Sequence, residues 1–126
     1  MGAESESPVA NNIAFQPMGK TTKVIASSTA NTVTLTADSP VNQYLVVNHE
    51  KTNGTGFPVY VRISATSSNA VVPTGHGENA AYGIPVPPGT MFVFTGPQCS
   101  STTSVYFSAI SENDAPEIYV TPGEGL

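Results

Sequence analysis

The chain has 126 residues, of which 10% are charged and 39% hydrophobic, with 11 Gly, 11 Pro and a formal net charge of -5. That length allows one domain, and the scarcity of Lys and Arg together with the frequent prolines excludes a helical bundle. Recurring clusters of Val, Ile, Tyr and Phe at modest net charge argue against intrinsic disorder.

The same composition limits the partners. Lys and Arg together number 4, too few to neutralise many phosphates, so nucleic acid and anionic membranes are not expected as partners. The acidic start differs from a secretory signal, and no run approaches the roughly 18 apolar residues of a membrane-spanning helix. A single cysteine, Cys99, excludes an intrachain disulfide and is expected to be a small buried filler. The domain therefore depends on its own core or on neighbouring subunits.

In chain order, residues 1–12 come first and are small, polar and acidic, with Pro8 interrupting any helix. This composition predicts an extended N-terminal arm, followed by one β domain over residues 13–126.

From residue 13 onward, short apolar clusters alternate with turn residues, which is typical of an all-β domain. Strict alternation in 32–36 puts Val33 and Leu35 on one face, and 59–63 is expected to bury Val59, Val61 and Ile63 while Arg62 faces solvent or a partner. Residues 43–48 are apolar on both faces, which indicates a central strand. The predicted strands are 22–26, 32–36, 43–48, 59–63, 70–73, 90–95, 104–110 and 117–121.

Turn residues separate these strands. The stretch 74–83 is rich in glycine and predicts a surface loop, and residues 53–56 must turn. Prolines in 84–89 restrict that segment to a sheet edge or a polyproline-like connection. About eight short antiparallel strands in one domain predict a two-sheet antiparallel β-sandwich of jelly-roll type, with a small closed barrel as the alternative.

Residues 14–21 fit a permissive phosphate-loop pattern that ends in Gly19, Lys20 and Thr21. That motif works because its amides lie at the N-terminus of a helix. The residues after Thr21 are β-branched and rich in serine, and Pro17 removes one amide. A plain turn before the first core strand is therefore expected.

Other catalytic patterns are incomplete. His76 and Glu78 with Cys99 resemble part of a zinc deaminase signature, but Thr102 stands where a second thiolate is required. A metal shared around a symmetry axis by His49 or His76 of each subunit stays open. No serine lies in Gly-x-Ser-x-Gly, and Glu112 with Asp114 reads as a capped turn. We expect no enzyme activity, no cofactor and no metal within one chain.

Five segments together resemble small virion structural proteins of tailed bacteriophages: 14–19, 43–48, 58–63, 70–73 and 119–126. The resemblance covers most of the chain and lies in the order and the residue composition of these segments. It implies a β-sandwich on the outer surface of a capsid, made in the host cytoplasm, which acts as a cement or decoration protein and forms trimers. The major capsid protein is the implied partner.

A protein of this kind needs no catalytic group; it needs complementary surfaces and an arm that can cross to a neighbour. Arg62 and the arm are candidates for such contacts, as are aromatic side chains outside the regular strands. The candidate interface residues are Met1, Pro8, Asn12, Phe15, Phe57, Arg62 and Tyr82. The alternative is a carbohydrate- or receptor-binding β-sandwich of a phage fibre or tail, which the absence of Trp disfavours.

Overall fold

Short apolar runs between turn residues become strands throughout the chain. The structure is a computed structural model and describes residues 15–49, 58–77, 79–112 and 116–125. These residues contain nine strands and no helix. The strands are β1 (Gln16–Pro17), β2 (Thr22–Ile25), β3 (Asn31–Leu35), β4 (Val41–His49), β5 (Val59–Ser64), β6 (Ile84–Val86), β7 (Met91–Cys99), β8 (Val105–Ile110) and β9 (Glu117–Glu124).

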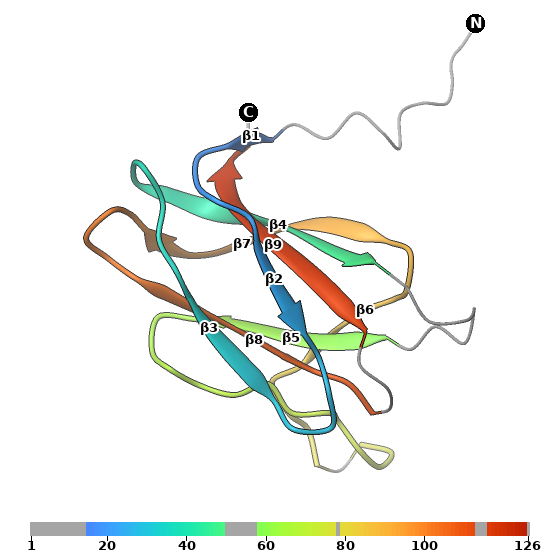
Figure 1. The fold of residues 1–126 in the computed structure, drawn as a ribbon. Helices are drawn as coiled ribbons and strands as arrows, with labels where there is room; N and C mark the ends of the chain where they lie inside the picture. Colours follow the sequence, from blue (N-terminus) through green and yellow to red (C-terminus); the bar gives the residue numbers. More distant parts are fainter. Residues whose placement is uncertain (1–14, 50–57, 78, 113–115, 126) are drawn as a thin grey trace, which may run out of the picture.

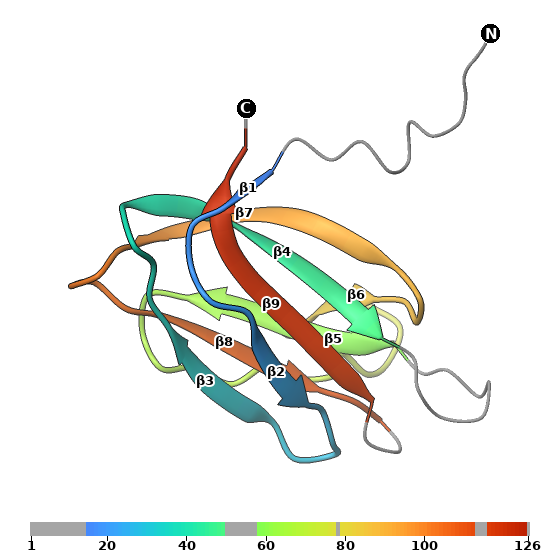
Figure 2. The ribbon, with the colours of Figure 1, turned by 45° about the horizontal axis from the view of Figure 1, so that its top comes forward.

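The strands form two antiparallel sheets, so the predicted two-sheet sandwich is confirmed. In the five-stranded sheet, β9 pairs with β1 and β2 on one side and with β4 on the other, and β4 pairs with β7. The four-stranded sheet has the order β3-β8-β5-β6. Figures 1 and 2 show these two sheets as separate layers, and they share no strand, which argues against the closed-barrel alternative.

The core lies between the sheets, where alternate residues of each strand meet. The largest fully buried side chains include Tyr44 on β4, Phe107 on β8 and Ile118 on β9. As predicted, Leu35 is buried and Val33 packs against the core, while Val59 and Val61 are buried and Ile63 partly so. β4 is the central strand that its two apolar faces indicate.

Asn48 connects the two sheets near one edge of the sandwich. Its side chain is buried, and its Nδ2 donates a 2.8 Å hydrogen bond to the carbonyl oxygen of Val86 in the other sheet. The turn between β6 and β7 also contacts it, because the amide of Gly89 donates to the Asn48 carbonyl at 3.0 Å. Gly89 has a φ of 72°, a conformation that favours glycine, and closes the turn as predicted.

β1 was not predicted from the sequence. It has two residues and includes Pro17, which a sheet tolerates only at an edge. Gly123 on β9 makes the pairing possible, since a β-carbon there would overlap the Phe15 ring and the carbonyl oxygen of Gln16. This close approach of the chain leaves no sequence signal except the glycine itself.

The predicted strand at 70–73 is wrong. This segment has no strand pairing and lies against the outward-facing side chains of the four-stranded sheet. The Ala70 amide donates a 2.8 Å bond to Ser108 Oγ on β8, and Thr32 Oγ1 on β3 donates to Asn69 Oδ1 at 2.8 Å. The Ser108 hydroxyl takes the Ala70 amide, and the Val71 amide donates to the carbonyl oxygen of Tyr82 at 3.2 Å, so both amides are satisfied without a strand ladder.

The loop predictions hold within the described residues. Thr74–Gly77 and Asn79 are exposed and have no strand pairing, and β6 lies at a sheet edge, as its proline requires. The arm at 1–12 and the turn at 53–56 lie outside the described residues.

Candidate functional site

Among the residues that the structure describes, the histidines, the cysteine and the carboxylates do not gather in one place. His49 ends β4, where its ring lies edge-on to Tyr119 with centroids 6.2 Å apart, whereas His76 is exposed in the loop after β5. In the described ranges, no group of three or more His, Cys, Asp or Glu could hold a metal ion. Glu78 and Asp114, named in the sequence motifs, lie outside those ranges.

Cys99 is buried at the end of β7, as expected for a filler. Its neighbour is Tyr44, whose hydroxyl donates a hydrogen bond to the carbonyl oxygen of Pro97. Burial, and next the hydrogen bond with Cys99, raise the pKa of the Tyr44 hydroxyl well above its ordinary value of 10.0. The Tyr44 hydroxyl therefore stays neutral, and both side chains belong to the core.

The described part of the phosphate-loop motif, residues 15–21, includes β1 and the turn that leads into β2, and this turn is as expected. Strand β2 follows it in place of the helix that a phosphate site requires. Thr21 Oγ1 shares a 2.7 Å hydrogen bond with Thr121 Oγ1 on β9, which anchors the motif to the sheet.

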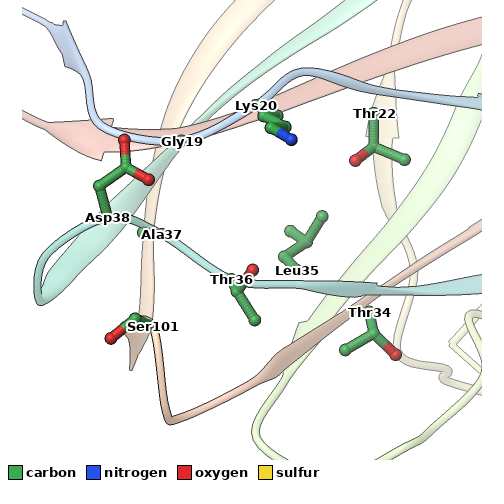
Figure 3. Close-up of a pocket in the computed structure, with 9 residues that line it drawn as sticks. All are labelled: Gly19, Lys20, Thr22, Thr34, Leu35, Thr36, Ala37, Asp38 and Ser101. Atoms are coloured by element: carbon green, nitrogen blue, oxygen red, sulfur yellow. The ribbon is translucent and has the colours of Figure 1, made fainter.

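An open cavity of about 410 Å³ lies beside this turn (Figure 3). Lys20 and Thr22 stand on one side and the end of β3 on the other, with Leu35 pointing between them. It is lined by Gly19, Lys20, Thr22, Thr34, Leu35, Thr36, Ala37, Asp38 and Ser101. This lining offers hydroxyls, one ammonium and one carboxylate, but no His or Cys and no aromatic ring. These polar groups suit weak binding of a hydroxylated molecule.

The outer face of the five-stranded sheet carries a group of apolar side chains among polar ones. Tyr44 and Val46 face the core, so alternation turns Leu45 and Val47 of β4 outward. The pairing register places Val93 beside Leu45, and Met91 and Tyr119 beside Val47. With the outward Ile25 of β2, these side chains form what we call the apolar patch: Ile25, Leu45, Val47, Met91, Val93 and Tyr119.

Polar groups border the apolar patch, and two of them lie opposite its members: Glu117 opposite Ile25 and Thr121 opposite Leu45. Lys23 Nζ lies 4.0 Å from Glu117 Oε2, and the Tyr119 hydroxyl donates to Glu117 Oε1 at 3.0 Å. At the other end, Gln43 Nε2 reaches Thr95 Oγ1 at 3.4 Å. An apolar centre with a polar rim is the usual arrangement of a protein interface.

The two sheets differ in what covers them. Asn69 and Ala70 lie over the outer face of the four-stranded sheet, where Ser108 is fully buried. No described segment lies in this way over the apolar patch, where Ile25 is 46% and Met91 44% exposed. Apolar surface gathered on one sheet face marks a binding surface more often than chance.

Among the predicted interface residues, Arg62 and Tyr82 come together. The Arg62 guanidinium carbon lies 4.2 Å from the centroid of the Tyr82 ring, which is 72% exposed. Phe15 is half-buried and packs over Gly123 at the end of the five-stranded sheet, away from that pair. Met1, Pro8, Asn12 and Phe57 lie outside the described residues.

Sequence reasoning missed the apolar patch, although part of its signal was present. The run 43–48 is apolar on both faces, and a central strand explains only one of them. Met91 and Val93 alternate with Phe92 and Phe94 in the same way. The sequence does not reveal which of the two sheets has its outer face covered by another segment of the chain. In the structure, the path of residues 69–72 decides this.

Comparison with protein-family models, curated proteins and solved structures finds no significant match to this chain. Over the part of the chain that the structure describes, no helix has the length and apolarity to span a membrane.

Proposed function

We propose that the protein is a non-catalytic structural protein of a virion, which binds the outside of a phage capsid as a cement or decoration protein and stabilises the shell. The observation that carries this proposal is the uncovered apolar patch on the five-stranded sheet. An exposed apolar surface of this kind is typically buried by contact with another protein.

The strand order supports the jelly-roll type within the sandwich class. From β2 onward, successive strands alternate between the two sheets, except that β5 and β6 are neighbours in one sheet. With the two-residue β1 set aside, the resulting orders, β2-β9-β4-β7 and β3-β8-β5-β6, are those expected of a jelly roll. Jelly rolls are common in viral capsid proteins and in lectins, so this order favours both functions considered from the sequence.

The size of the patch fits a contact repeated over a lattice. Four strand positions about 4.8 Å apart and roughly five residues along each strand give a patch of about 300 Å², below the roughly 800 Å² that each partner buries in a standard interface. One such contact is weak. Many copies on one shell, each also held by its neighbours in a trimer, add their contributions.

A carbohydrate- or receptor-binding role in a fibre or tail is the second candidate. The hydroxyl-lined cavity between β2 and β3 and the exposed Tyr82 favour it. These features lie apart from the apolar patch, so variants in each region separate the two functions.

The test is addition of the purified protein to capsids that lack it. We expect the protein to sediment with the shells in a saturable amount and to raise their melting temperature. A native mass of a trimer, three times the 13.0 kDa chain, is expected before mixing. A protein that ignores capsids and binds glycans instead would contradict the proposal and support the second candidate.

A further inference from the structure

The four-stranded sheet has an open edge where β5 extends beyond its neighbour. β6 pairs with Val59, Tyr60 and Val61 only, whereas β8 pairs with β5 as far as Ser64. Within the described residues, the last part of β5 therefore has a strand on one side only. Exposed strand edges accept further strands.

The register shows which backbone groups face the open side. Pro85 lies opposite Tyr60 and has no N–H, so the hydrogen-bonded pairs between β5 and β6 are those of Val59 and Val61. Backbone groups alternate sides along a strand, and the N–H and C=O of Ile63 must then point to the same open side. An extended chain laid beside β5 would find one donor and one acceptor there.

Side chains complete a site at this edge. A cavity of about 230 Å³ is lined by Val61, Arg62, Ile63, Ser64, Tyr82, Gly83 and Ile84. Ile84 is 49% exposed, and Tyr82 is still more exposed. The cavity therefore offers apolar surface to a small side chain of the incoming segment.

Arg62 gives the site a positive charge. Its guanidinium stacks on Tyr82 and reaches the carbonyl oxygen of Asn69 at 3.4 Å. No carboxylate among the described residues forms an ion pair with it. In an acidic protein with few cations, this charge favours an acidic extended segment.

We propose that this edge binds the N-terminal segment of a second copy of the chain, laid as a short strand beside Ile63. The segment supplies the required chemistry, since Glu4 and Glu6 alternate with small residues and Val9 and Ala10 follow. In an extended strand both glutamates lie on one face, and that face meets Arg62. The small apolar residues occupy the cavity beside Tyr82.

The N-terminal segment is long enough to reach a second copy of the chain. Residues 1–14 precede the first described residue, and an extended segment of that length spans at most about 46–50 Å. Each copy would give its segment and receive another, and a closed ring of copies satisfies every edge. The proposed function already includes a trimer, and this inference adds the residues that hold the copies together; it does not depend on binding to a shell.

The test is sedimentation velocity of the full chain over a wide range of concentrations. We expect a concentration-dependent cyclic oligomer, weakened about tenfold or more by Arg62→Glu, because like charges then face each other. Replacing both Glu4 and Glu6 by Arg should weaken it similarly. Combining these changes with Arg62→Glu should restore association, since the charges are opposite again.

Lys20→Glu is the matched control, because it makes the same charge change at an exposed lysine beside the other cavity. It should leave the oligomer unchanged, and thermal melting of each variant shows whether it is folded. A wild-type monomer at every concentration, or a combined variant that stays dissociated, would overturn the proposal. If the wild-type protein forms the oligomer but does not bind shells, the proposed function is contradicted and this inference stands.

Discussion

Leu45→Lys is expected to abolish binding to the shell while leaving the fold intact. Leu45 lies in the middle of the apolar patch, between Val93 of β7 and Thr121 of β9. A lysine there can extend its amine to water in the free protein, so folding is little affected. In the docked state the same charge is buried without a partner, and this costs at least about 2 kcal/mol, or roughly thirtyfold in affinity.

Thr34→Lys is the control for that variant. Thr34 is exposed on β3 in the four-stranded sheet, so the substitution adds the same charge on a different face. Cosedimentation with capsids is the measurement, and only Leu45→Lys should lower the bound fraction. Equal loss for both variants would show that net charge, and not the apolar patch, governs binding.

Phe107→Ala is expected to destabilise the domain by about 3–5 kcal/mol. Phe107 is fully buried on β8, where it pairs with Val33 on one side and Ile63 on the other. Removing the ring leaves a cavity between the two sheets that rigid strands fill only in part. The free energy of unfolding of an ordinary domain is about 5–15 kcal/mol, so this loss is a large part of it.

Phe92→Ala makes the same chemical change where the ring is 43% exposed. It should lower the free energy of unfolding much less, because the Phe92 ring keeps part of its contact with water in the folded state. The midpoints of urea unfolding, at equal slope, compare the two variants. Similar losses would contradict the assignment of Phe107 to the core and Phe92 to the edge of the sandwich.

The strands follow from local sequence because period-2 apolar patterns and turn residues act over a few positions. Val33 with Leu35, and Val59 with Val61, reach the core as their alternation requires. The segment 70–73 has the same local character but no strand, since the hydroxyl of Ser108 takes the amide that a ladder would use. That competition depends on a residue 38 positions away.

The surface contacts could be predicted from the sequence less well than the core. The contact between Arg62 and Tyr82 joins two residues that the sequence singled out separately, and only the fold brings them together. The apolar patch joins side chains from four strands, and its members look like core residues when each strand is considered alone. Whether an apolar side chain is covered is decided by chain path, which local patterns do not encode.

Hydroxyl-radical footprinting of the protein, free and bound to shells, tests the central claim most directly. Met91 in the apolar patch and Tyr82 on the four-stranded sheet are both exposed and readily oxidised, so they report on opposite regions in one experiment. At concentrations where the free protein is already oligomeric, we expect shell binding to protect Met91 and to leave the oxidation of Tyr82 unchanged. Protection of Tyr82 with Met91 still oxidised would contradict it.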